Sequence, residues 1–109
     1  MQLSLEHVEK EMAGEGISPG QLADYRVYLA ALYSLRAAEM QDILAVKPRN
    51  WLTIRARKNS DKATDREWEA TEDGLRETQL KWELRRIEKL SSAAATKLRI
   101  MEVEARNIV

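Results

Sequence analysis

Apolar residues along most of this chain recur at intervals of three and four, the spacing that places side chains on one face of an α-helix. No stretch alternates apolar and polar residues in the way of a half-buried strand. The pattern therefore predicts an all-α protein, a helical hairpin or bundle with a long C-terminal helix. Its clearest early run comprises Leu22, Tyr25, Leu29, Leu32, Leu35, Met40, Ile43 and Leu44.

Capping and turn residues divide the 109-residue chain into segments of one helical domain. Ser18 opens a capping box that predicts a helix start, and Pro48 predicts a break or kink. Thr64 opens a second capping box, and Gly74 is where we expect the last helix to bend. The predicted segments are a short helix and linker (1–17), an amphipathic helix (18–46), a basic segment and turn (47–63) and a long C-terminal helix (64–107).

The C-terminal helix carries two apolar faces. The first is a stripe whose spacings alternate between four and three, typical of a coiled-coil seam, and which ends at Ile108. The second joins Trp68, Leu75 and Trp82 on another side of the helix. Either the N-terminal helices cover both faces, or one face packs on a neighbouring subunit. We expect a homo-oligomer whose interface comprises Leu80, Leu84, Ile87, Ala94, Leu98, Met101 and Ala105.

Charge is sorted along the chain although the total is zero. Residues 1–46 carry three basic and seven acidic groups, residues 47–66 seven and two, and residues 67–109 eight and nine. A cation cluster beside an aromatic ring is typical of surfaces that hold single-stranded nucleic acid. The sequence therefore predicts a nucleic-acid-binding set comprising Lys47, Arg49, Trp51, Arg55, Arg57, Lys58 and Lys62.

Two other interpretations of the basic segment stay open. Its cations can form a solvated helix face, or they can pair with acids from elsewhere, for example Glu39 or Asp42. Trp51 can be a stacking platform for a base or a core residue, and its apolar neighbours Leu52 and Ile54 make the core our default.

The sequence offers little for catalysis or metal binding. His7 is the only histidine, and on a short polar helix we expect it to be a solvated surface residue. The chain has no cysteine, and no set of His, Asp and Glu has metal-ligand spacing. We therefore expect a protein that is not an enzyme and that uses no cofactor and no metal.

Nothing in the sequence predicts association with a membrane. The longest apolar stretch, residues 27–35, includes two tyrosines and a serine. It is far shorter than the roughly 20 residues that cross a bilayer. No basic region precedes an apolar segment near the N-terminus, as a secretion signal requires. We expect a cytoplasmic protein.

The order of these elements resembles that of the phage recombination mediators of the UvsY type. An amphipathic helix precedes a basic stretch reading Ile54-Arg55-Ala56-Arg57-Lys58, which an acidic polar stretch and a C-terminal helix follow. In that helix Leu80-Lys81-Trp82 precedes a run of Ser, Ala, Lys and Arg over 90–99, similar to the family's Leu-Gln-Tyr-Trp and its following run. The similarity spans residues 22–106.

This resemblance implies a non-enzymatic phage protein of the host cytoplasm that binds single-stranded DNA. It also implies a ring-like homo-oligomer that helps a recombinase to displace single-strand-binding protein during DNA recombination. By the same resemblance, Arg55 and Arg57 match the family's Lys-Ala-Arg and would contact phosphates. The helix over residues 82–106 would mediate assembly.

A protein of another class fits the residues as well. It is a helical protein–protein adaptor or inhibitor, a coiled-coil interaction module that does not bind nucleic acid. The acidic N-terminal third, with a formal charge of −4 over residues 1–46, suits a basic partner. Binding to single-stranded oligonucleotide separates the two interpretations.

Overall fold

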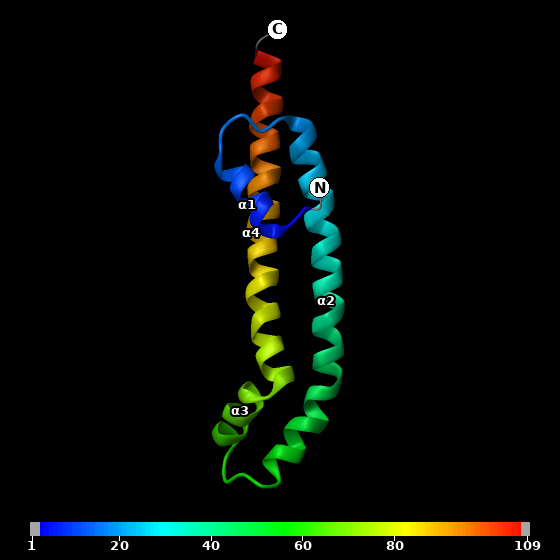
Figure 1. Ribbon diagram of the computed structural model, residues 1–109, viewed down its shortest axis with the longest axis vertical. Coiled ribbons are helices and arrows are strands. Elements are labelled where there is room, and N and C mark those ends of the chain that lie inside the picture. The colour runs from blue at the N-terminus through cyan, green and yellow to red at the C-terminus, as the bar shows by residue number, and fades with distance from the viewer. Residues whose placement is uncertain (1–2, 108–109) are drawn as a thin grey trace. The chain divides into compact units, whose positions relative to one another are not determined.

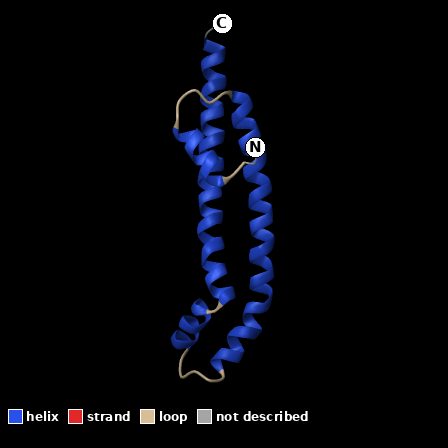
Figure 2. Ribbon diagram, in the orientation of Figure 1, coloured by secondary structure: helices blue, strands red, loops and turns tan. Residues whose placement is uncertain are grey.

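The computed structural model describes residues 3–107, which form helices joined by short connections (Figure 1). The all-α prediction is confirmed, and no strand occurs among these residues (Figure 2). Within the same range, no helix combines the length and the apolar character that crossing a membrane requires. The described helices are α1 (Leu5–Ala13), α2 (Pro19–Arg55), α3 (Asp61–Ala70) and α4 (Glu72–Asn107).

The chain folds as two compact units. The first unit joins the chain up to Ser34 with the chain from Arg85 onward, and the second comprises Leu35–Leu84. α2 and α4 each contribute one part to the first unit and one part to the second. Each unit has its own cluster of buried apolar side chains.

In the first unit, α1 packs with the beginning of α2 and the second half of α4. Val8, Leu22 and Ile87 are fully buried at its centre. Burying an aliphatic side chain of this size contributes about 1.5–3 kcal/mol to folding. The carboxylate of Glu9 pairs with the guanidinium of Arg86 and so ties α1 to α4.

Serine caps start the first two helices, and the cap at Ser18 is the one that the sequence predicts. The N–H of His7 donates to Ser4 Oγ at 3.1 Å. Ser18 and Gln21 bond reciprocally, at 2.9 and 3.1 Å, which confirms the predicted capping box. The expectation that His7 is a solvated residue is wrong, because its ring is half-buried and meets Tyr25 edge-on, with ring centroids 6.2 Å apart.

Pro48 does not break α2, which continues to Arg55. A proline removes a single backbone donor, so one hydrogen bond of the helix is lost while its neighbours remain. The helix curves in this stretch (Figure 1). The boundary expected between residues 46 and 47 is therefore absent, and the first half of the basic segment is helical.

The predicted single helix over 64–107 is two helices that meet at Thr71. The N–H of Thr71 donates to the carbonyl of Trp68 at the end of α3, over 3.0 Å. Its Oγ1 accepts from the N–H of Gly74 at 3.0 Å, in the first turn of α4. One threonine thus ends one helix and starts the next, three residues before the predicted bend.

The glycine at position 74 serves a close approach between these two helices. A methyl group at Gly74 would lie 1.8 Å from the carbonyl oxygen of Trp68. The start of α3 also differs from the prediction, because its cap is Ser60, whose Oγ accepts from the N–H of Ala63. Thr64 is instead fully buried inside α3, and its hydroxyl donates to the carbonyl of Ser60.

Leu80, Ile87 and Ala94 of the apolar stripe of α4 lie in the core of this chain, which corrects the assignment of these three residues to a subunit interface. Leu80 is fully buried in the second unit, and Ile87 and Ala94 are fully buried in the first. Helices of the same chain cover them. The partly buried Leu84, Leu98 and Met101 pack against the same clusters, Ala105 is exposed, and Ile108 lies outside the described residues.

Candidate nucleic-acid interface

The predicted nucleic-acid-binding residues occupy the last turns of α2, the turn after it and the start of α3. All of them belong to the second unit. The buried apolar side chains behind them come from α2, α3 and α4, and comprise Met40, Ile43, Ile54, Trp68 and Leu80. The predicted residues are close in sequence, but the structure gives them different environments, and Arg49 lies on the side of α2 away from Trp51 and the core.

Lys47 is half-buried and contacts a buried carboxylate of this unit. Its ammonium lies 2.9 Å from Oε1 of Glu77 and 5.6 Å from the centre of the Trp68 ring. The carboxylate of Glu77 also accepts from Trp68 Nε1 at 2.9 Å and lies 3.2 Å from the ammonium of Lys81. Since Glu77 is only 4% exposed, the inclusion of Lys47 in a phosphate-binding surface is corrected.

Glu77 keeps its charge in this environment. Burial by itself raises the pKa of its carboxyl group, because it penalises the charged form. Hydrogen bonds from Trp68, Lys47 and Lys81 favour the charged form more strongly, and the pKa is lowered below its ordinary value. The carboxylate thus joins α2, α3 and α4 through one charged centre.

Trp51 combines features of both interpretations. Its ring is half-buried and packs against the core cluster of the second unit. Its Nε1 donates to Oδ1 of Asp65 on α3, at 2.8 Å. The ring is therefore anchored at its polar edge and partly open to solvent.

Three cations at the end of α2 and in the following turn pair with acids of α3. Arg55 Nε lies 2.8 Å from Asp61, and its Nη1 donates to the carbonyl of Lys58 at 2.7 Å. Arg57 and Lys58 share Glu67, at 3.1 and 3.7 Å. These acids were missed as partners because α3 was expected to start at Thr64, within one long helix.

Neither of the acids considered as partners from the sequence, Glu39 and Asp42, pairs with a cation of the basic segment within residues 3–107. Glu39 accepts hydrogen bonds from Nε and Nη2 of Arg76, at 2.7 and 2.8 Å, and lies 3.8 Å from Arg36. The hydrogen bond from Arg76 favours its charged form, so the pKa of Glu39 is lowered. Asp42 is exposed and makes no ion pair within residues 3–107.

Two cations of the predicted set are exposed and form no ion pair among the described residues, namely Arg49 and Lys62. The second unit is nevertheless neutral as a whole, because residues 35–84 contain ten Lys or Arg and ten Asp or Glu. Any attraction for a polyanion therefore depends on the local arrangement of charges rather than on net charge.

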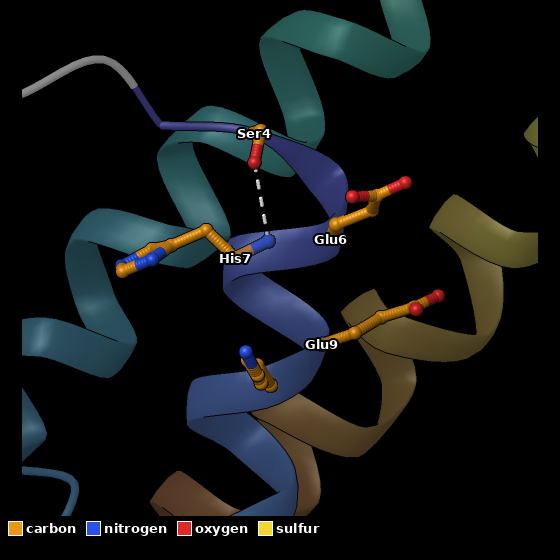
Figure 3. Close-up of a pocket in the computed structure, with 5 residues that line it drawn as sticks. Ser4, Glu6, His7 and Glu9 are labelled. Carbon is orange, nitrogen blue, oxygen red and sulfur yellow. Dashed lines mark hydrogen bonds between the residues drawn. The ribbon is translucent and has the colours of Figure 1, made fainter.

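One hollow of the surface is lined by residues of α1 and its cap. The hollow at α1 measures about 550 Å³ and is lined by Ser4, Glu6, His7, Glu9 and Lys10. Figure 3 shows the His7 ring pointing away from the carboxylates of Glu6 and Glu9, so no acid–base pair forms there. Among the described residues, no three His, Asp or Glu side chains gather as metal ligands would.

Comparison with family models, with curated proteins and with solved structures finds no match for this chain. Function is therefore inferred from the contacts and charges of the described residues.

Proposed function

We propose that this protein binds single-stranded nucleic acid, with DNA as the favoured ligand, at the end of α2 and the following turn. The role is that of a non-enzymatic accessory protein in phage recombination, as the resemblance to recombination mediators implies. The observation that supports it most is that Arg55 follows Trp51 by one helical turn and Arg57 and Lys58 come in the turn after α2, while Trp51 stays only half-buried. Phosphates would contact the cations, and a base would stack on the exposed part of the ring.

The ion pairs that hold these cations are of the kind a phosphate can replace. The side chains of Asp61 and Arg57 are 77% and 61% exposed, and those of Arg55, Lys58 and Glu67 are 38%, 36% and 30% exposed, so each pair is partly open to solvent. Exposed pairs contribute about 0–1 kcal/mol each, whereas phosphate binding also releases counterions from the strand. Lys47 differs, because Glu77 is buried. The proposed contact set is therefore Trp51, Arg55, Arg57, Lys58 and Lys62, and it leaves out Arg49, which is exposed on the side of α2 away from the core of this unit.

Acids of α3 compete with the ligand in this arrangement. Asp61 pairs with Arg55, and Asp65 accepts a hydrogen bond from the Trp51 ring. Glu67 pairs with both Arg57 and Lys58. The bound strand must take over these contacts. We therefore expect moderate affinity and a steep dependence on salt.

The test is an anisotropy titration with labelled oligo-dT and with an unrelated single strand at several salt concentrations. Replacing Arg55 and Arg57 together with alanine should weaken binding to both strands equally. The slope of log K against log salt should fall by about 0.7 per lost phosphate contact. The matched control replaces exposed Arg26 and Arg99 of the first unit, which removes the same charge elsewhere. Equal affinity and slope for both double variants would refute the proposal.

An adaptor without nucleic-acid binding is the second candidate, and exposed apolar side chains favour it. In the second unit, Leu35, Leu52, Leu75 and Trp82 are 65%, 63%, 55% and 66% exposed. Apolar surface of this kind is a mark of contact with other proteins. If oligonucleotides do not bind at low salt, this candidate gives the better account of the chain.

A further inference from the structure

The outward side of α2 in the second unit has a pattern of its own. Met40, Ile43 and Ile54 point into the core of this unit. On the opposite side of the helix, exposed residues follow one another at intervals of three, four, three, four and three. They are Leu35, Ala38, Asp42, Ala45, Arg49 and Leu52, called here the α2 seam.

The α2 seam has the spacing of a coiled coil but no facing helix within residues 3–107. Alternating intervals of three and four define the contact positions of two paired helices. The large side chains at the two ends of the seam, Leu35 and Leu52, remain 65% and 63% exposed. Between them lie two alanines and two residues of opposite charge.

We propose that the α2 seam pairs with the α2 seam of a second copy of this chain, antiparallel and around a twofold axis. In heptad terms, Leu35, Asp42 and Arg49 occupy position a, and Ala38, Ala45 and Leu52 occupy position d. In an antiparallel pair, position a of one helix faces position d of the other. This register sets Leu35 against Leu52 of the second copy at both ends. It sets Ala38 against Arg49 of the second copy, and Asp42 against Ala45.

The charges of the seam select this register. Asp42 and Arg49 each lack an ion pair within the described chain. In the antiparallel pair, Arg49 of one copy lies beside Ala38 of the other, four residues from Asp42. Four residues span about 6 Å of helix, a distance that an arginine side chain covers.

The twofold axis generates this ion pair twice, and the small side chain of Ala38 leaves room for the arginine stem. A parallel pair would instead set Asp42 against Asp42 and Arg49 against Arg49. Like charges in facing positions repel, so the parallel arrangement is disfavoured.

The seam is short, which sets the strength expected of the dimer. The distance from Leu35 to Leu52 along the helix is about 26 Å, and the curvature of α2 limits contact beyond it (Figure 1). Small interfaces form transient complexes rather than permanent ones. We therefore expect a dimer that forms and dissociates with concentration. The inference does not rest on nucleic-acid binding.

The first test exchanges the charges of Asp42 and Arg49. Dimer formation is measured by sedimentation equilibrium between low micromolar and several hundred micromolar protein. Asp42→Arg alone and Arg49→Asp alone should each weaken the dimer at least tenfold, because each sets like charges together. The double variant Asp42→Arg/Arg49→Asp should restore the association. Glu69→Arg is the matched control for Asp42→Arg, since it also replaces an exposed acid with arginine, but in α3. Circular dichroism monitors helicity in every variant.

Crosslinking tests the register independently, because the chain has no cysteine of its own. Leu35→Cys and Leu52→Cys chains should form a disulfide when mixed and little when each is oxidised alone. A wild-type chain that stays monomeric over the whole range would overturn the proposal. So would helical single variants that dimerise like wild type, a double variant without rescue, or efficient crosslinking of Leu35→Cys to itself.

Discussion

Removing the charge of Glu77 should destabilise the second unit measurably. The variant Glu77→Gln keeps the shape and can still accept from Trp68 Nε1, but it loses the ion pairs with Lys47 and Lys81. Breaking a fully buried pair costs about 3–5 kcal/mol. The Lys47 and Lys81 side chains are 33% and 63% exposed and can turn to water. We therefore expect a loss of about 2 kcal/mol, nearer the strength of hydrogen bonds to charged groups.

Thermal and urea unfolding at pH 7 measure this loss, which corresponds to about 8 °C in Tm for a chain of this size. The loss must also depend on pH. Because the folded-state pKa of Glu77 is lowered from 4.5, its contribution is present above pH 4.5 and is lost as the pH falls through the folded-state value. The stability difference between wild type and variant should shrink accordingly.

The control for this experiment is Glu69→Gln, which removes a charge from an exposed position of α3. It should change stability by less than about 0.5 kcal/mol. A Glu77→Gln variant as stable as the control, or a difference from wild type that stays constant between pH 7 and pH 3, would show that the buried carboxylate does not stabilise the unit.

Three further changes test other contacts. Gly74→Ala should cost about 3 kcal/mol or more by chemical denaturation, because its methyl group meets the Trp68 carbonyl at 1.8 Å; an unchanged midpoint contradicts this close approach. Ile87→Ala should cost about 2–5 kcal/mol, and a smaller loss means that its site collapses around the cavity. Neutralising Asp61, Asp65 and Glu67 as amides should strengthen oligonucleotide binding about tenfold in anisotropy titrations; unchanged affinity shows that α3 does not compete.

Local signals predicted the helix starts best. The cap at Ser18 is a contact between residues three apart, so the sequence contains all of it. The break at Thr71 was missed because Gly74 occupies the position where a capping box has Glu or Gln. The close packing that requires glycine there involves the backbone of α3, which periodicity does not reveal.

The site was predicted less completely, because tertiary contacts decide which acid each cation pairs with. The basic segment was identified from its cations, but Lys47 meets Glu77 across 30 positions and Arg57 meets Glu67 across 10. The stripe of α4 was recognised by its spacing, and spacing is the same whether the facing helix belongs to this chain or to another. Only the fold shows that Leu80 and Ile87 face helices of their own chain.

The division into two units has a consequence for folding during synthesis. The second unit is one uninterrupted stretch, and contacts such as Trp68 with Glu77 close short loops, so it can form as soon as Leu84 has left the ribosome. The first unit must wait, because the pair between Glu9 and Arg86 joins residues 77 positions apart. Until then, α1 and the start of α2 lack the α4 side chains that bury them, and the nascent chain exposes that apolar surface to chaperones.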